Sequence, residues 1–159
     1  MSDEIKSTSV HKVEEVLKSY EISTKIVQFS ESTRTAQEAA DAIGCTIAQI
    51  VKSLIFCTEK THKPILVLTS GINRVNEKNI EALVGEKIKK ADAEFTRNVT
   101  GFAIGGVPPV GHAQKITTFI DEDLLQYKEV WAAAGTPHTV FCLNASDLPR
   151  ITDGVVIKV

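Results

Sequence analysis

The sequence lacks the cysteine pattern of a small secreted protein and any apolar run long enough to enter a membrane. Only 3 cysteines are present, and none belongs to a C-x-x-C pair, so neither a disulfide framework nor a paired-thiol site is expected. No apolar run approaches the ~20 residues of a transmembrane helix, and the acidic start Met1–Glu4 is not followed by an apolar signal segment. A reduced, cytoplasmic protein with no membrane partner is therefore expected.

An excess of charge of either sign is also missing. The 18 Lys and Arg residues nearly balance the 20 Asp and Glu residues, which leaves a net charge of −2 at pH 7. A protein that coats nucleic acid through bulk electrostatics is therefore not expected, although the basic run Lys87, Lys89 and Lys90 is compatible with a local contact. The 4 histidines show no metal-ligand spacing with the cysteines, so we expect neither a metal nor another cofactor.

The remaining composition is that of an ordinary globular chain. With 159 residues, 43% of them hydrophobic and 24% charged, the chain can bury a core as one domain. We expect an N-terminal tail over residues 1–8 and a domain over residues 9–159. Helical patterns alternate with short apolar runs, which predicts an α+β domain with a mixed sheet. The expected helices cover residues 10–20 after a Ser9 cap, 36–43, 76–84, 92–98 and 145–151 after an Asn144 cap, and the expected strands cover 25–29, 50–57, 64–70, 117–120, 130–134, 139–143 and 155–159.

Glycine and proline gather in one stretch, Gly101-Phe102-Ala103-Ile104-Gly105-Gly106-Val107-Pro108-Pro109-Val110-Gly111-His112. Four of the 9 glycines and two of the 5 prolines fall here, and the apolar run at residues 102–104 predicts a strand that enters a rigid turn. Glycines let a backbone bring its N–H groups close to a ligand, and prolines fix the direction of the remaining donors. Such a row of donors suits an anion or a developing oxyanion. An ordinary tight connection between two strands is the alternative.

A lysine interrupts the most apolar strand. The segment Ile50 to Cys57 is apolar on both faces, as expected of a central strand, and period-two alternation places Lys52 on the same face as Ile50 and Leu54. An ammonium group on such a face is costly without a partner. Either Lys52 lies at the mouth of a cleft, where it holds an anionic ligand group, or it reaches solvent as a gatekeeper of the strand.

Two further polar segments are candidates for a binding site. Thr33 and Arg34 precede Thr35, which forms a capping box with Glu38. Local capping is one interpretation of these residues, and an anion bound near the start of the helix is the other. The second candidate is another rigid turn, Gly135-Thr136-Pro137-His138.

Several familiar catalytic arrangements are missing. No Gly-Lys-Ser/Thr follows the Gly105 loop, and the chain contains neither Gly-x-Gly-x-x-Gly nor Gly-x-Ser-x-Gly. A dyad of Cys142 with His138 or His112 would place the thiol inside a strand, where a buried structural thiol is expected. What remains is a site of backbone donors, one lysine and one or two histidines. Such a site polarises a carbonyl or phosphate without a protein nucleophile.

The order of these motifs resembles the YbaK/EbsC family, the free-standing relatives of the editing domain inserted in bacterial prolyl-tRNA synthetases. The resemblance runs from about Ser9 to the C-terminus. It is carried by Ala36-Gln37-Glu38-Ala39-Ala40, Gln49-Ile50-Val51-Lys52-Ser53-Leu54, Gly101-Phe102 and Gly105 to His112. It implies a curved, barrel-like mixed sheet flanked by helices, and the deacylation of mischarged aminoacyl-tRNA.

The resemblance also implies roles for particular residues. Lys52 matches a lysine near the terminal nucleotide of the substrate, and Gly105 to Pro109 match a Gly-x-x-x-Pro loop that lines the aminoacyl pocket. Backbone amides are expected to hold the carbonyl oxygen, while a group of the substrate assists the attack of water. The residues assigned on this basis are Lys52, Gly105, Gly106 and His138 as catalytic, and Thr33, Ser53, Val107, Pro108, Pro109, Gly111, His112, Gly135 and Thr136 as substrate-binding.

The expected partner is the acceptor end of an aminoacyl-tRNA, with tRNA(Pro) as the carrier and an aminoacyl-tRNA synthetase as a further partner. The cysteinyl-specific branch of the family has an aspartate where Val140 stands and a glutamine where His112 stands. A small acyl group such as alanine, 2-aminobutyrate, serine or threonine is therefore predicted in place of cysteine. Two other interpretations stay open: a non-catalytic module that binds a small molecule, a nucleotide or a synthetase, and a thiol-dependent hydrolase that uses Cys57 or Cys142.

Overall fold

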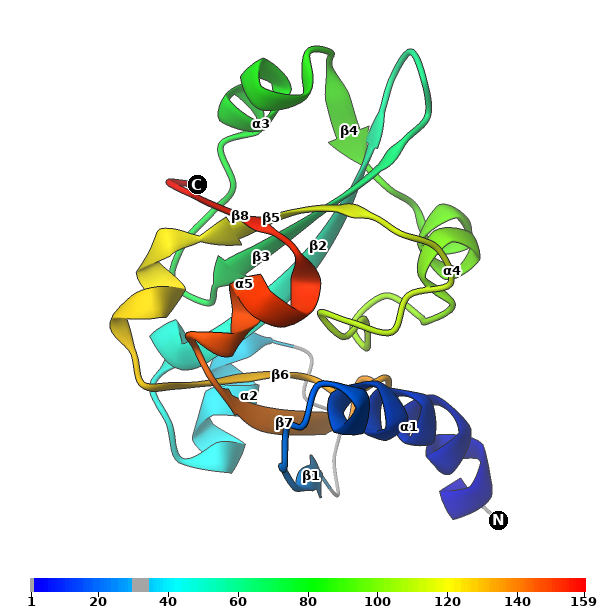
Figure 1. Ribbon diagram of the computed structural model, residues 1–159, viewed down its shortest axis with the longest axis vertical. Coiled ribbons are helices and arrows are strands. Elements are labelled where there is room, and N and C mark those ends of the chain that lie inside the picture. The colour runs from blue at the N-terminus through cyan, green and yellow to red at the C-terminus, as the bar shows by residue number, and fades with distance from the viewer. Residues whose placement is uncertain (1, 30–34) are drawn as a thin grey trace.

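An eight-stranded mixed sheet is the framework of the fold (Figure 1), with the strand order β1-β7-β6-β2-β3-β5-β8 and β4 paired to β2. The computed structural model describes residues 2–29 and 35–159, with side chains from residue 8 onward. In chain order the elements are α1 (Ser2–Ser19), β1 (Ile26–Gln28), α2 (Ala36–Ile43), η1 (Ile47–Gln49), β2 (Ile50–Thr58), β3 (Pro64–Ser70), α3 (Glu77–Val84), β4 (Ile88–Lys90), α4 (Ala93–Thr100), β5 (Thr117–Asp121), η2 (Glu122–Gln126), β6 (Glu129–Ala133), β7 (Thr139–Asn144), α5 (Asp147–Thr152) and β8 (Val155–Ile157). The predicted α+β class with a mixed sheet flanked by helices is confirmed.

Strand β2 lies at the centre of the sheet, as its apolar sequence predicts. It pairs antiparallel with β3 from Val51 to Cys57, which confirms the expected hairpin. On its other edge it pairs in parallel with β6 only at Ile50 and Val51, and antiparallel with β4 only from Phe56 onward. Among the described strands, none pairs with that edge of β2 at Ser53. The edge is therefore open where β6 and β4 diverge.

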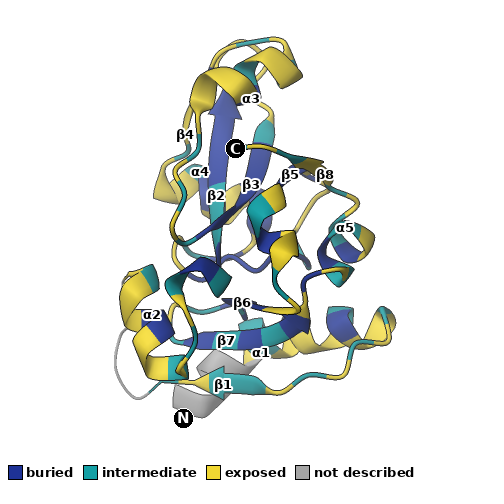
Figure 2. Ribbon diagram, turned by 90° about the vertical axis from the view of Figure 1, so that its left-hand side faces the viewer, coloured by how far each residue is buried: buried dark blue, intermediate teal, exposed yellow. Residues whose placement is uncertain are grey.

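Helices cover both faces of the sheet. Val51 and Ile55 of β2 belong to the main core, which α1, α4, α5 and the loop after α4 complete. Ile50 packs with α2, and Phe56 packs with Ile80 of α3, on the opposite face. The buried residues run along the central strands, and the exposed residues lie on the outer surfaces of the helices (Figure 2). The alternation expected for β2 is thus confirmed.

Local capping explains why the helices begin and end where they do. The hydroxyl of Thr35 accepts a hydrogen bond from the backbone N–H of Glu38 at 3.1 Å, as the predicted cap requires. Gly44 ends α2 with a left-handed φ of 86°, a conformation that costs glycine little. Asn76 and Asp92 cap α3 and α4 in the same way.

Three expectations about element boundaries were wrong. Helix α1 begins at Ser2, not after Ser9, because no proline or glycine stops the helix before that residue. Asn144 continues the pairing of β7 with Glu129, so α5 begins only at Asp147. No strand forms at residues 102–104, because Phe102 turns into the core while Ile104 is 54% exposed. The division into a tail over residues 1–8 and a domain over residues 9–159 stays a prediction.

The basic run after α3 contains a short strand that the sequence did not indicate. Ile88 is buried, and β4 pairs with the end of β2. Lys89 and Lys90 remain exposed, as expected of a solvated basic run. In the part of the chain that the structure describes, no helix combines the length and apolarity needed to cross a membrane.

Candidate functional site

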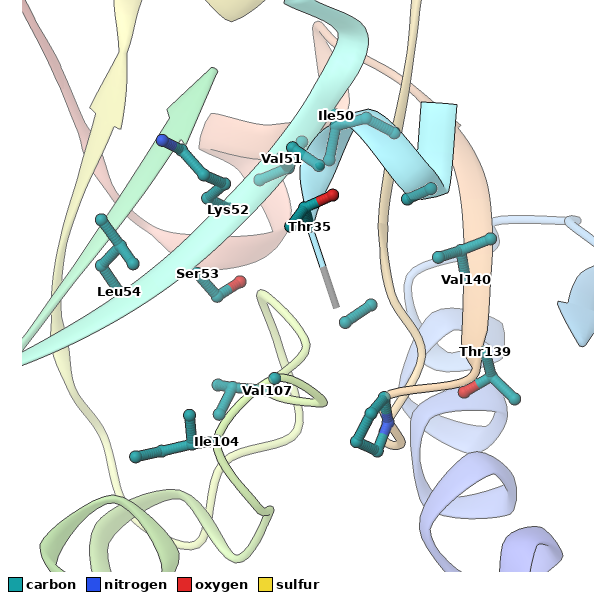
Figure 3. A pocket seen from close by; sticks show the side chains of 15 residues that line it. Thr35, Ile50, Val51, Lys52, Ser53, Leu54, Ile104, Val107, Thr139 and Val140 are labelled. Atoms are coloured by element: carbon teal, nitrogen blue, oxygen red, sulfur yellow. The ribbon is translucent and has the colours of Figure 1, made fainter. Parts of the chain in front are cut away.

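A cavity of about 280 Å³ lies at the open edge of β2. We call it the main cavity. Its walls come from the start of α2, residues 50–54 of β2, the loop after α4, and the turn between β6 and β7 (Figure 3). Of the residues assigned from the sequence, the structure brings Lys52, Ser53, Gly105 and Val107 to this cavity. Thr33 and Arg34 lie outside the described residues.

The two rigid turns contact each other because Gly106 has no side chain. A Cβ atom at Gly106 would lie 2.7 Å from the Cα and the carbonyl carbon of Thr136, closer than non-bonded carbon atoms approach. Gly135 packs against α1 in a similar way, since a Cβ there would lie 2.9 Å from the carbonyl oxygen of Ser9. Gly106 and Gly135 therefore serve packing, which fixes the wall of the main cavity.

The backbone donors expected in the loop are only partly available. The N–H of Gly106, which we expected to hold an oxyanion, donates to the carbonyl oxygen of Ala103 at 3.0 Å and is occupied. The N–H groups of Gly105 and Val107 donate to no acceptor among the described residues, and both residues line the main cavity. Two residues of the cavity wall thus carry backbone donors without an acceptor among the described residues, and the packing of Gly106 and the prolines that follow restrict the loop that carries them.

Lys52 lies on the opposite face of β2 from Ser53, and its ammonium points away from the loop after α4 (Figure 3). The ammonium donates a hydrogen bond of 2.7 Å to the backbone carbonyl of Asn73, which explains how a lysine is tolerated on this apolar face. Burial lowers the pKa of Lys52, the Arg74 guanidinium adds to this, and Asp121 opposes it. The ammonium is therefore held at Asn73 and does not lie beside the loop after α4.

A buried carboxylate holds the segment that binds Lys52. Asp121 is 1% exposed, and its oxygens accept hydrogen bonds from the backbone N–H of Ser70 at 2.9 Å, from the side-chain amide of Asn73 at 2.8 Å and from the N–H of Asp123 at 3.0 Å. The amide of Asn73 also donates to the carboxylate of Asp123 at 2.7 Å. Asp121 therefore fixes the Asn73 carbonyl to which the ammonium of Lys52 donates.

Ser53 points toward the loop after α4 (Figure 3). Its hydroxyl oxygen is buried and has no hydrogen-bond partner in the described part of the chain. Buried hydroxyl groups are normally paired, so an unpaired one in a cavity wall indicates a place for a polar ligand atom. Ser53 is the polar side chain that faces the free donors of the loop.

The two candidate histidines do not line the main cavity. The Nε2–H of His112 donates to the carbonyl oxygen of Pro108 at 2.7 Å, and His112 lines a separate hollow with Pro109 and Gly111. Burial lowers the pKa of His112, while the bond to Pro108 opposes that shift. The backbone N–H of His138 donates to the hydroxyl of Thr136 at 3.3 Å, and its ring lies outside the cavity walls. In this structure His112 stabilises its turn through its ring, and His138 contributes to its turn through its backbone.

The cysteines show no sign of activation. Burial, with Glu129 nearby, raises the pKa of the Cys142 thiol to about 11, and burial also raises the pKa of Cys57. A nucleophilic thiol needs the opposite shift, so the thiol-dependent hydrolase is disfavoured. Among the described residues no three metal-ligating side chains gather.

Four further residues of the cavity wall were not assigned to the site from the sequence. Ala39 of α2, Ile104 of the loop, and Thr139 and Val140 of β7 all line the main cavity. These residues are far apart in the chain. They meet because β6 pairs with the first residues of β2, α2 packs on Ile50, and the loop after α4 contacts the turn between β6 and β7. No local signal in the sequence predicts such a meeting. Only the resemblance pointed to part of it, through the motif at the start of α2 and the comparison at Val140.

Comparison with known proteins gives a consistent result. The family model described as "Aminoacyl-tRNA editing domain" matches residues 30–151. The chain is 28% identical over 127 residues to the uncharacterized protein YwhH of Bacillus subtilis, covering 80% of each protein. It is 24% identical over 133 residues to an Enterococcus faecalis protein named "Putative Cys-tRNA(Pro)/Cys-tRNA(Cys) deacylase EbsC", covering 78% of this chain and 80% of that protein.

Longer proteins and solved structures show the same likeness. The chain is 32% identical over 94 residues to the proline–tRNA ligase of Limosilactobacillus fermentum, a match that covers 57% of this chain and 16% of the ligase. A crystal structure described as "a putative trans-editing enzyme for prolyl tRNA synthetase" is 44% identical and superimposes with a TM-score of 0.88, covering 94% of this chain and 95% of that one.

Proposed function

This chain belongs to the aminoacyl-tRNA editing domain family, and from that premise we propose that it hydrolyses mischarged aminoacyl-tRNA in trans. The predicted carrier is tRNA(Pro), and the acyl group is small and non-cognate. Membership of the family confirms the resemblance drawn from the sequence. The substrate and the mechanism are proposals, supported by the cavity at the open edge of β2.

The observation that carries the proposal is that Gly105 and Val107 both line the main cavity and that their backbone N–H groups have no acceptor among the described residues. In the proposed reaction the oxygen of water bonds to the acyl carbon, the ester bond to the ribose oxygen breaks, and the proton of water passes to that ribose oxygen. The two donors stabilise the oxyanion, and each such donor is worth roughly 10²–10³ in rate. An aminoacyl ester is already activated, so orientation and these donors suffice without a protein nucleophile.

Lys52 has a different role in this proposal. Lys52 lines the main cavity, and its ammonium is held at the Asn73 carbonyl oxygen, on the side of β2 away from the loop after α4. From there it holds the 3′-terminal nucleotide and leaves the acyl group to the loop. The start of α2 at Thr35 and Ala36, which also lines the cavity, adds backbone N–H groups suited to a phosphate.

The test is a deacylation assay of the purified protein on a panel of charged tRNAs. The panel carries alanine, serine, threonine, cysteine or 2-aminobutyrate on tRNA(Pro), and the same acyl groups on one non-proline tRNA. We expect turnover of one or two of the acyl groups on tRNA(Pro). Silence across the panel from a folded protein would overturn the proposal and favour the non-catalytic binding module.

A pair of lysine variants separates the role of Lys52 from a general effect of charge. Lys52→Ala should abolish deacylation and leave the far-UV circular dichroism unchanged. Lys60→Ala, in the exposed turn between β2 and β3, removes the same charge far from the cavity and should keep full activity. Substantial deacylation by a folded Lys52→Ala protein would exclude the role given to Lys52.

A further inference from the structure

A second cavity of about 200 Å³ adjoins the main cavity. We call it the side cavity. The two cavities share Ser53, Leu54, Ile104, Gly105 and Val107 in their walls. Gly105 and Val107, whose N–H groups have no acceptor among the described residues, therefore line both spaces. A group bound at those donors can extend into either cavity.

Two residues that line the side cavity carry hydroxyl groups without a hydrogen-bond partner among the described residues. Thr96 of α4 is 1% exposed and lines the side cavity, and its hydroxyl oxygen has no hydrogen-bond partner within residues 2–29 and 35–159. The hydroxyl of Ser53, on the facing strand, is buried and unpaired in the same way. A buried hydroxyl without a partner is costly. Two of them in the wall of one cavity indicate a polar occupant.

The rest of the wall limits the chemistry of that occupant. Ile55, Phe56 and Ala91 supply an apolar surface, which suits a short carbon chain. Lys90 also lines the side cavity, and its ammonium disfavours a cationic group. A carboxylate would have to lose its water against Phe56 and Ala91. A neutral hydroxyl on the occupant both donates and accepts hydrogen bonds, so it can pair with the hydroxyls of Thr96 and Ser53.

We propose that the side cavity is the subsite for the acyl side chain, and that Ser53 and Thr96 select an acyl group with a hydroxyl on its β-carbon. This inference rests on the proposed deacylase function and names its substrate class as seryl or threonyl esters. The ester carbonyl lies at the Gly105 and Val107 donors, and the acyl side chain turns from there between β2 and α4. An acyl group without the hydroxyl leaves both protein hydroxyls buried and unpaired, which is the basis of discrimination.

The experiment compares acyl groups that differ by one oxygen atom. Threonine and 2-aminobutyrate form one matched pair, and serine and alanine form the other, all on tRNA(Pro). We expect the wild-type protein to show kcat/KM values roughly tenfold or more higher for the hydroxylated member of each pair, as expected from one or two hydrogen bonds. Equal values, or higher values for the apolar member, overturn the proposal while leaving the deacylase function intact.

Thr96→Val is the central variant, because valine keeps the shape of threonine and removes only the hydroxyl. We expect it to lower kcat/KM for the threonyl ester roughly tenfold and to leave the 2-aminobutyryl ester unchanged or faster. Thr69→Val is the matched control. Thr69 is 0% exposed and its hydroxyl is unpaired in the described chain, but it lines neither cavity. This control should keep the wild-type ratio.

Two further results of the ester comparison would also count against the proposals. If Thr96→Val and Ser53→Ala lower the rates for all four esters equally, the hydroxyls hold the attacking water or the fold, and the proposal is overturned. If the wild-type protein hydrolyses none of the four, the deacylase function itself fails. A circular dichroism melt of each variant shows whether a loss of rate reflects a loss of fold.

Discussion

Thr96 and Thr100 lie one turn apart on α4 and are both buried, but only one of the two hydroxyl groups is hydrogen-bonded. The hydroxyl of Thr100 donates to the carbonyl oxygen of Thr96 at 2.7 Å and accepts from the N–H of Phe102 at 3.0 Å. The hydroxyl of Thr96 pairs with nothing in the described residues. The two positions therefore differ in what the hydroxyl contributes to the free energy of unfolding.

Valine substitutions measure that difference directly. Thr100→Val removes two hydrogen bonds and leaves the N–H of Phe102 unpaired, so it should lower the free energy of unfolding by about 1–3 kcal/mol. Thr96→Val removes an unpaired polar atom and should leave the stability unchanged or raise it by about 1 kcal/mol. Urea denaturation of both variants gives the comparison. A Thr96→Val protein as unstable as Thr100→Val would show that the Thr96 hydroxyl is part of the scaffold.

His112 makes the stability depend on pH. Burial holds the pKa of the His112 imidazole below the ordinary value of 6.5. Below pH 6.5, His112 therefore binds a proton more readily in the unfolded chain than in the folded chain. Stability should therefore fall as the pH drops through and below about 6.5, by up to roughly 1.4 kcal/mol per pH unit. His112→Gln keeps an N–H for the carbonyl oxygen of Pro108 but does not titrate. Thermal melts between pH 5 and 7.5 should show a shallower slope for the variant.

The difference between the two slopes isolates His112, because the other titrating groups are common to both proteins. Parallel curves for the wild type and His112→Gln would mean that the ring is not buried in the folded protein. That result would remove the structural role given to His112 and reopen the role in substrate binding.

The contact between the two rigid turns is the element on which the main cavity depends. Gly106→Ala places a methyl group against the backbone of Thr136, and overpacking of this kind costs about 1–3 kcal/mol. We expect a lower melting temperature and, because the Gly105 and Val107 donors move with the loop, a loss of most deacylation. Gly85→Ala is the comparison. It strains a left-handed residue at 85° with nothing within 4 Å, so it should destabilise slightly and keep activity. Full activity in Gly106→Ala would exclude the coupling of the two turns.

Elements with local signals were predictable from the sequence, and elements that depend on distant pairing were not. Thr35 and Gly44 bracket α2 because capping and left-handed glycine act within a few residues. Asn144 has the same capping chemistry as Thr35, yet its pairing with Glu129 keeps it in β7. The sequence around Asn144 is a valid cap signal that tertiary pairing overrides. Strand β4 was missed for the same reason, since Ile88 is buried in a cluster with Phe56, Ile65 and Phe119, which lie far from it in the chain.

In the candidate site, too, local features were predictable from the sequence and contacts between distant segments were not. The position of Lys52 on the apolar face of β2 was expected from the sequence. Its hydrogen-bond partner, the carbonyl oxygen of Asn73, could not be predicted, because every residue has a backbone carbonyl. Gly106 was expected to donate its N–H, but a tight approach of two loops requires glycine equally well. The sequence shows that glycine is needed there without showing which of the two reasons applies. Thr96 carried no signal, since a single threonine in a helix is ordinary.

At the scale of the whole molecule, the charge distribution fits recognition of a chain end better than recognition of a long duplex. The net charge is −2, and the positive groups that act on Lys52 are Arg74 and Lys90. Both are exposed, and Lys90 lies in the wall of the side cavity. Lys52 and Lys90 line the cavities, and Arg74 is close enough to act on Lys52. This basic cluster can meet two or three phosphates, as in a single-stranded acceptor end, and is too small to follow a helical arm.

Salt dependence measures that footprint. With two or three phosphate contacts on a single strand, the slope of log K against log salt should be about −1.5 to −2, so tRNA affinity should fall roughly tenfold between 50 and 200 mM salt. Arg74→Gln should reduce the slope by about 0.7, and Lys60→Gln, outside the cluster, should not change it. Fluorescence anisotropy with an uncharged tRNA at several salt concentrations gives the slopes. A steep slope, or equal effects of both variants, would mean that the protein binds the tRNA body through a surface other than these cavities.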